Sequence, residues 1–195
     1  MNETNQTDRF APLFTELGRR LAGEAPVRLA IEGGSASGKT TLGKILAERY
    51  CCTVFHMDDF FLRSEQRTAA RFAEPGGNVD RERFLAEVLL PLRRGEKVFY
   101  RRFDCASMQL QNAVETAPKK LVVAEGAYSM HPDLAPYYDL SVFLDISPEL
   151  QRERISRRNT PEKANRFFAE WIPMEQAYFA AFDIPAKCTL RLPIL

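Results

Sequence analysis

The sequence has no excess of positive or negative charge and no long apolar run. These two absences argue against nucleic-acid-binding and membrane-spanning proteins. Its 195 residues carry 27 Lys and Arg against 26 Asp and Glu, a net charge of +1. Without a basic surplus, electrostatics gives no reason to expect a nucleic-acid partner. No apolar run reaches the roughly 18 residues that a membrane-spanning helix needs, and the polar N-terminus lacks the apolar core of a signal peptide. We therefore expect no membrane partner and a cytoplasmic location.

Disulfide and metal-ligand spacings are also missing. No two cysteines form a C-x-x-C pair, and the two histidines are far apart in sequence. This pattern predicts reduced cysteines in a cytosolic protein, without a zinc-type site. The hydrophobic fraction of 45% and the charged fraction of 27% are ordinary for a globular chain. The cysteines are Cys51, Cys52, Cys105 and Cys188.

The most informative stretch that the sequence does contain is Gly33–Thr40. It reads Gly-Gly-Ser-Ala-Ser-Gly-Lys-Thr and fits the phosphate-binding pattern G-x-x-x-x-G-K-[ST] at every fixed position. The glycines allow a tight turn that aims backbone N–H groups at phosphate oxygens. Lys39 adds a positive charge for the β- and γ-phosphates, and the Thr40 hydroxyl can ligate Mg²⁺. We expect a nucleoside triphosphate, ATP or another, to contact Gly33, Gly34, Ser35, Ala36, Ser37, Gly38, Lys39, Thr40 and Thr41.

The flanking segments support this interpretation over an ordinary Gly/Ser-rich turn. Val27–Ile31 has the composition of a short buried strand that leads into the loop. The segment Thr41–Tyr50 has apolar residues at helical spacing, so the order is strand, glycine loop and helix N-terminus. An ordinary turn requires neither this order nor the Lys-Thr pair.

The rest of the chain alternates apolar strands with helical stretches. Such alternation predicts an α/β protein of the P-loop NTPase three-layer type, with a parallel sheet flanked by helices. We expect one domain over 1–195, with an acceptor-site excursion at about 60–115 and a lid at about 150–165. A hairpin or edge strand is expected at 98–103, and another edge strand at 188–192. Strands are predicted at 27–31, 53–56, 121–124 and 140–145, and helices at 8–23, 41–50, 80–94 and 148–158.

Carboxylates follow two of these strands, where parallel sheets bind ligands. Asp58 and Asp59 come after the strand at 53–56, and Glu125 comes after the strand at 121–124. A phosphotransferase that acts on an alcohol needs a carboxylate for the hydroxyl proton and further ligands for Mg²⁺. The alternatives are helix N-capping for the two aspartates and a solvated turn for Glu125. Taken together, the two positions favour function.

A basic run follows on the helix predicted at 148–158. Cations that close over the migrating phosphoryl group assist its transfer, so we expect at least one of Arg154, Arg157 and Arg158 to contact phosphate. The alternative is a solvated charged face, which is the usual environment of such a run.

From about Val27 to about Arg158 the pattern resembles the uridine kinase and phosphoribulokinase group of P-loop kinases. The loop at Gly33–Thr40 is similar to the group's G-x-S-x-S-G-K-T, and Asp58-Asp59-Phe60-Phe61 resembles its D-S-F-Y segment. Asn78-Val79-Asp80 resembles N-F-D, and Val123-Ala124-Glu125-Gly126 resembles the E-G motif. The segment at 138–145 is similar to Y-D-L-x-I-F-V-D, and 154–158 matches the arginine-rich lid helix.

This resemblance implies a role for each matching residue. Asp58 would be the base, Asp80 would hold the hydroxyls of the acceptor, and Glu125 would lie near Mg²⁺ with Thr40. Asp59 takes the place of Asp58 if the alignment is fixed on Arg63, although we prefer Asp58. Lys39, Arg154 and Arg158 would complete the catalytic set.

The sequence departs from the group where uridine kinases have a Y-D-F-x-x-H-like segment. Phe103–Met108 lacks the second aromatic residue and the histidine of that segment. Of the residues that would line the acceptor pocket there, only the aromatic Phe103 matches the group. The resemblance implies transfer of a γ-phosphate to an alcohol of a small molecule, with a nucleoside as the favoured acceptor. The alternative is a nucleotide-binding switch or ATPase, although we find no N-K-x-D or L-S-G-G-Q segment. A homo-oligomer is left open.

Overall fold

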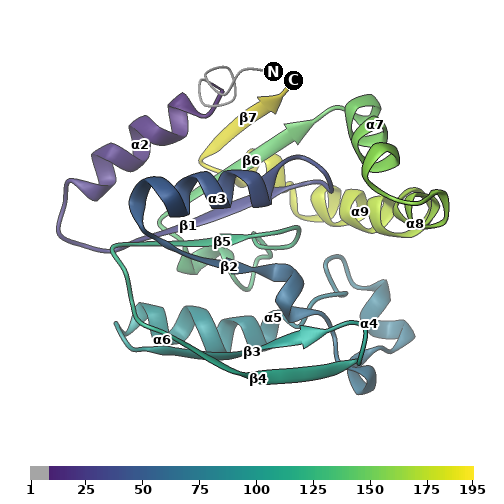
Figure 1. The fold of residues 1–195 in the computed structure, drawn as a ribbon, viewed down its shortest axis with the longest axis horizontal. Helices are drawn as coiled ribbons and strands as arrows, with labels where there is room; N and C mark the ends of the chain where they lie inside the picture. The colour runs from purple at the N-terminus through teal and green to yellow at the C-terminus, as the bar shows by residue number, and fades with distance from the viewer. Residues whose placement is uncertain (1–8) are drawn as a thin grey trace.

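A five-stranded parallel sheet forms the centre of the computed structural model, which describes residues 9–195 (Figure 1). Its strands run in the order β2-β5-β1-β6-β7, and all four neighbouring pairs are parallel. The predicted fold class is confirmed, because helices flank this sheet. The strands are β1 (Val27–Gly33), β2 (Thr53–His56), β5 (Leu121–Glu125), β6 (Leu140–Ile146) and β7 (Leu190–Ile194).

The predicted elements are present with small changes at their ends. The edge strand expected at 188–192 is β7, which begins and ends two residues later and pairs with β6. The helix expected at 8–23 is the shorter α2 (Ala11–Leu21), and Asp8 lies outside the described residues. Helix α7 (Pro148–Arg158) has the predicted bounds, and α3 (Lys39–Tyr50) begins two residues earlier than expected.

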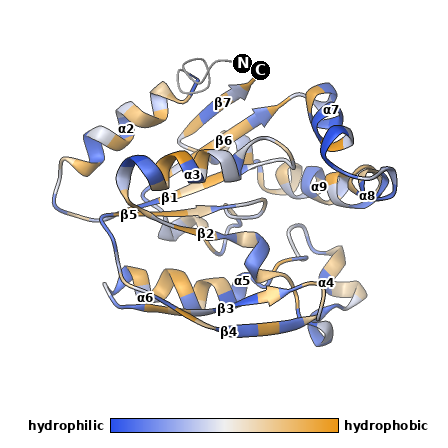
Figure 2. Cartoon of the chain, in the orientation of Figure 1, coloured by the Kyte–Doolittle hydropathy of each residue, from blue (hydrophilic) through white to orange (hydrophobic). Residues whose placement is uncertain are grey.

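Strand residues alternate between two apolar cores, one on each face of the sheet. Leu29 and Val123 lie in the core covered by α2 and α3, whereas Ala30 and Val122 lie in the core on the opposite face. Period-two alternation with apolar residues on both faces is expected of a parallel sheet covered by helices. In Figure 2, α7 is mostly hydrophilic, as expected for a helix at the surface. The other helices are α4 (Ala69–Ala73), α5 (Arg81–Phe84), α6 (Leu90–Arg93), α8 (Pro161–Arg166), α9 (Ile172–Phe182) and α10 (Ile184–Lys187).

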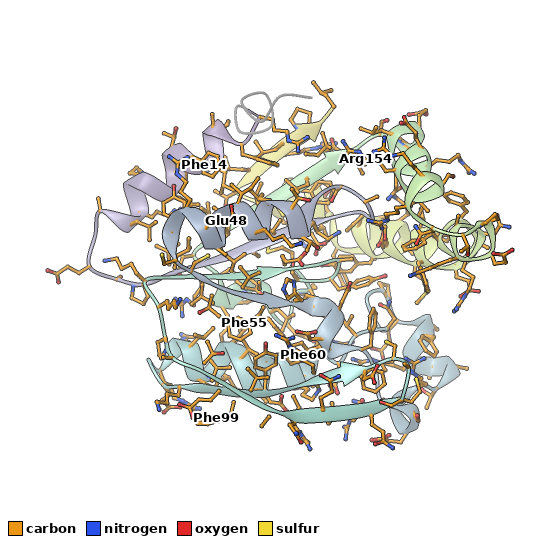
Figure 3. The ribbon with its side chains drawn as sticks, viewed as in Figure 1. Phe14, Glu48, Phe55, Phe60, Phe99 and Arg154 are labelled. Atoms are coloured by element: carbon orange, nitrogen blue, oxygen red, sulfur yellow. The ribbon has the colours of Figure 1, made fainter. Side chains whose placement is uncertain are left out.

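An antiparallel hairpin forms a second, two-stranded sheet. Strand β3 (Val98–Asp104) pairs with β4 (Gln109–Thr116), which confirms the hairpin alternative for residues 98–103. Phe55 and Phe60, labelled in Figure 3, lie between the main sheet and this hairpin. The ring centroids of Phe55 and Phe60 are 5.3 and 5.7 Å from that of Tyr100 in β3. Aromatic packing therefore holds the hairpin against the sheet.

The helical run predicted at 80–94 is interrupted by a π-helical turn, η3 (Leu85–Leu89), between α5 and α6. Pro91 follows two residues later. Its ring lacks an N–H and would meet the carbonyl of Glu87, four residues earlier, in a regular α-helix. The wider turn avoids that contact. The same order recurs where the π-helical turn η5 (Phe167–Trp171) precedes Pro173.

Short 3₁₀ turns connect several of these elements. They are η1 (Met57–Phe60), η2 (Ser64–Gln66) and η4 (Ala135–Tyr137). Within residues 9–195, no helix combines the length and the apolar composition needed to cross a membrane.

Leu29 provides a test of how much the α2–α3 core contributes to stability. Its side chain is fully buried, whereas Leu195 is 92% exposed. We expect Leu29→Ala to lower the free energy of unfolding by about 2–5 kcal/mol, because the truncation leaves a cavity. Leu195→Ala is the matched control and should change it by less than about 0.5 kcal/mol. Urea unfolding measures both, and equal effects would contradict this assignment of the core.

Candidate active site

The segment Gly33–Thr40 connects β1 to the N-terminus of α3. Gly33 and Gly38 have φ angles of 147° and 101°, in the region that favours glycine. A side chain at Gly33 would also come within 2.6 Å of the Leu144 carbonyl oxygen. The Lys39 ammonium donates to the carbonyls of Gly33 and Gly34 at 2.8 and 2.9 Å. An ammonium has three donors, so one N–H of Lys39 remains for a ligand.

The middle of this loop is held by side chains from distant helices. Glu175 of α9 accepts hydrogen bonds from the Ser35 N–H at 2.8 Å and from the Ser35 hydroxyl at 2.6 Å. Gln151 of α7 donates to the Ser35 carbonyl at 2.9 Å. A Cβ at Gly34 would come within 2.8 Å of the Gln151 amide nitrogen, which accounts for the second glycine.

Thr40, at the N-terminus of α3, and Glu125, at the end of β5, meet beside the loop. The Thr40 hydroxyl donates to Glu125 Oε1 at 3.0 Å. His56, the last residue of β2, lies with Nδ1 2.5 Å from the same oxygen. This contact raises the pKa of His56 above its usual value, because a carboxylate favours the imidazolium. Within residues 9–195, Glu125 Oε2 accepts no hydrogen bond, so it remains free for a further ligand.

Asp58 and Asp59 lie on η1, directly after β2. Asp58 is exposed, yet the surrounding protein desolvates its carboxyl group and raises the pKa, against the opposing charge of Lys39. Asp59 is half-buried, and its carboxylate lies 3.4 Å from the Arg102 guanidinium. Asp58 is therefore the aspartate with the more open carboxylate and the closer electrostatic link to Lys39.

Asp80 and Phe103 are both buried. Asp80 is only 2% exposed and caps α5, since its Oδ1 accepts from the Arg83 N–H at 3.1 Å. Its Oδ2 makes no hydrogen bond within the described chain, but it forms ion pairs with the Nε atoms of Arg83 and Arg63, at 3.4 and 3.8 Å. The ring of Phe103 is 5% exposed and lies under the Arg67 guanidinium at 5.9 Å. Capping accounts for one oxygen of Asp80, and the other faces the guanidinium groups of Arg83 and Arg63.

The two lid arginines occupy different environments. Arg154, labelled in Figure 3, donates to the Ala36 carbonyl of the loop at 3.3 Å. Arg158 lies 5.6 Å from the ring of Phe167 instead, and forms no hydrogen bond with the loop in the part of the chain that is described. Only Arg154 of the pair is thus in contact with the phosphate loop.

Four residues at the site were not predicted from the sequence: Glu32, His56, Gln151 and Glu175. His56 and Glu32 carried a weak local signal, because each places a polar side chain at the end of an apolar strand. Gln151 and Glu175 carried none, because they are 116 and 140 residues away from Ser35 along the chain.

Glu32 is fully buried directly before the loop. Its carboxylate accepts from the backbone N–H groups of Gly33 and Met130, at 2.9 and 3.0 Å, and from the Tyr178 hydroxyl at 3.1 Å. Burial raises the pKa of Glu32 to about 7, and these hydrogen bonds oppose the shift only in part. Glu32 thereby joins β1, the segment after β5 and α9.

A parallel sheet, a phosphate loop that opens a helix and carboxylates at adjacent strand ends are features of P-loop kinases. A family model covers more than half of the chain and matches residues 29–165. The protein belongs to the Phosphoribulokinase / Uridine kinase family. The family resemblance predicted from the sequence motifs is therefore confirmed.

Individual relatives differ in the substrate that their names give. A thymidylate kinase of Methylobacillus flagellatus is 33% identical over 135 residues, which are 69% of this chain and 59% of the relative. The chain thus spans less than two thirds of that protein. A uridine kinase of Shewanella amazonensis is 26% identical over 178 residues, 83% of each chain.

A solved structure supports the fold. A possible uridine kinase from Bacillus stearothermophilus superimposes with a TM-score of 0.74 at 20% identity. The match covers 96% of this chain and 99% of the other. At this identity the likeness bears on the fold alone.

Glu32 predicts an unusual pH dependence of stability. Its pKa is about 7 when folded and near 4.5 in a solvated glutamate. Between these values the unfolded chain releases the proton while the folded chain retains it, so stability falls as pH rises from about 4.5 to about 7. Glu32→Gln removes this effect. As the pH rises from 5 to 8, we expect the free energy of unfolding of the variant, relative to that of the parent, to increase by about 1–3 kcal/mol.

Urea unfolding at both pH values measures this difference. Glu24→Gln, at an exposed position, is the matched control and should show no such gain. A difference between Glu32→Gln and the parent that stays constant with pH would rule out titration of Glu32 in this range.

Proposed function

We propose that this protein transfers the γ-phosphate of ATP to an alcohol group of a small molecule, with a nucleoside as the favoured acceptor. The observation that carries the proposal is the position of Asp58 and Glu125. Asp58 follows β2, and Glu125 ends β5, which lies between β2 and the strand β1 that leads into the phosphate loop. A nucleotide-binding switch has no need of a carboxylate that is open to an acceptor.

On the donor side, the loop amides and Lys39 would bind the β- and γ-phosphates. The free N–H of Lys39 suits this role, because its other two N–H groups already bond to loop carbonyls. Arg154, attached to the loop through Ala36, would add positive charge near the transferred group. Arg158 would reach the phosphate only after leaving the ring of Phe167.

The residues around Thr40 suit Mg²⁺. The Thr40 hydroxyl and the free oxygen of Glu125 are hard oxygen donors, and Mg²⁺ in such sites takes one or two protein ligands together with phosphate oxygens. When bound, the ion would offset the charge that develops on the phosphates. His56 would fix the carboxylate of Glu125 through its other oxygen.

On the acceptor side, Asp58 would accept the proton of the attacking hydroxyl. Its raised pKa makes it a better proton acceptor than an ordinary aspartate. Asp80 would offer Oδ2, which makes no hydrogen bond in the described chain, to an acceptor hydroxyl, beside the guanidinium groups of Arg83 and Arg63. Phe103 would form part of the pocket wall, although it is nearly covered.

A panel assay tests the proposed function directly. Release of ADP is measured with Mg²⁺ and ATP, alone and with nucleosides and sugar alcohols added one at a time. Release that depends on one acceptor supports the kinase and names its substrate class. Hydrolysis that no acceptor accelerates would instead favour an ATPase or a nucleotide-dependent switch.

Substitution of the two aspartates tests which of them acts as the base. We expect Asp58→Asn to lower kcat by about 10²-fold or more, since a general base contributes about that much. The affinity for Mg·ATP should stay within a few-fold of the parent, because Asp58 does not belong to the phosphate loop. Asp59→Asn is the matched control and should lose less than about tenfold. The reverse order would assign the role to Asp59.

A further inference from the structure

The crest of the phosphate loop, defined here as Ser35 and Ala36, is held by side chains from outside the loop. Glu175 accepts from both the N–H and the hydroxyl of Ser35, and Gln151 donates to its carbonyl. All polar atoms of Ser35 are therefore bonded to side chains of α7 and α9. This was not expected from the sequence, where Ser35 was assigned to the nucleotide.

The backbone at the crest needs such support. Ala36 has a φ of 63°, a left-handed conformation that residues other than glycine seldom adopt. Its carbonyl accepts from Arg154, so the strained residue is fixed on both sides. Strained backbone persists only where the surroundings determine it, and here Glu175, Gln151 and Arg154 supply the surroundings.

The carboxylate of Glu175 is buried and depends on its hydrogen bonds with Ser35. The side chain is 4% exposed, and a buried carboxylate is unfavourable unless it is well hydrogen-bonded. Burial raises the pKa of Glu175, while Lys39 and the two bonds from Ser35 act in the opposite direction. One turn later on the same helix, Tyr178 donates to Glu32, just before the loop. Helix α9 is thus attached at two points, one on either side of Gly33 and Gly34.

We propose that Glu175 is a positioning residue, which holds the crest of the phosphate loop in the shape that binds Mg·ATP, with Gln151 as the second arm. The inference rests on the proposed function, since it concerns the nucleotide site of that reaction. Glu175 acts through Ser35 and does not contact the phosphates itself.

The expected effect follows from preorganisation. If the loop holds its binding shape for only a fraction of the time, the apparent affinity for the nucleotide falls by that fraction. Glu175→Ala removes two charge-assisted hydrogen bonds, so we expect the Kd of Mg·ATP to rise about tenfold or more. The negative charge of Glu175 works in the other direction, because it repels phosphate. The neutral isostere Glu175→Gln therefore separates shape from charge.

Calorimetric titration of the full chain with Mg·ATP, without an acceptor, provides the test. We expect Glu175→Gln to bind within about threefold of the parent, because its carbonyl oxygen still accepts from the Ser35 N–H and its amide can donate to the hydroxyl. Ser35→Ala should cause a smaller loss than Glu175→Ala. In the double variant the loss should not exceed that of Glu175→Ala, since both changes remove the same interaction.

Glu170→Ala is the matched control. Glu170 is exposed, lies on η5 and pairs with Arg166 at 3.3 Å, away from the loop. It should bind Mg·ATP as the parent does. Thermal unfolding of each variant shows that the titrated protein is folded, and the fitted stoichiometry reports the competent fraction. A positioning role moves Kd, whereas partial unfolding lowers the stoichiometry.

Two results would overturn the inference. One is parental affinity in a folded Glu175→Ala. The other is tighter binding in that variant, which would make Glu175 an inhibitory charge. Failure of the proposed function looks different, because the parent would then bind Mg·ATP without phosphorylating any acceptor, and the affinities of the variants would still be measurable.

Discussion

The register of the parallel ladder between β2, β5 and β1 is the constraint on which the site depends. His56 is paired with Glu125, and Glu125 with Ile31, so β2 and β5 end at one level and β1 continues two residues further into the loop. A shift of one residue would turn the side chain of Glu125 to the opposite face of the sheet. The ladder therefore fixes which side chains can meet at the loop.

A close approach at the end of β5 packs the backbone there against η1, the turn that carries Asp58 and Asp59. Gly126 has a φ of 144°, and a Cβ there would come within 2.6 Å of the Met57 Cβ. The backbone after Glu125 thus packs directly on η1, the turn that carries Asp58. The glycine of the E-G pair has a steric role that is separate from the chemical role proposed for the glutamate.

Three carboxylates that the protein desolvates lie within electrostatic reach of Lys39. Its charge lowers the pKa of Glu32, Asp58 and Glu175, while desolvation raises all three and is the larger effect in each. A bound triphosphate would add negative charge beside the same groups and favour their protonated forms further. A raised pKa helps a general base only as long as its carboxylate is still ionised at the working pH. In the proposed reaction the positive charge of Lys39 would therefore attract phosphate and also favour the ionised form of Asp58.

Local sequence was sufficient to predict the sheet, the loop and the strand-end carboxylates. The loop pattern and the apolar strands are contiguous, and the ligand position follows from the parallel topology. Glu175 and Gln151 were beyond such reasoning, because helix α9 has little apolar periodicity that distinguishes one face. Their contacts with Ser35 exist only after the chain has folded. The π-helical turns were also missed, although Pro91 and Pro173 supply a physical reason for them.

The two halves of the site differ in how far a sequence can specify them. Phosphates bind to backbone N–H groups, whose direction depends on glycine positions and on the helix that follows, so a short pattern is enough. The proposed acceptor site instead takes its side chains from the hairpin, η1 and the segment around Asp80, which the fold brings together from separate places. Phe103 illustrates the difference, because it occupies the expected position yet is nearly covered. The exposed Cys105 next to it lies within electrostatic reach of both Arg67 and Asp58. The tip of the hairpin, where this chain departs from the uridine kinase pattern, therefore lies near Asp58.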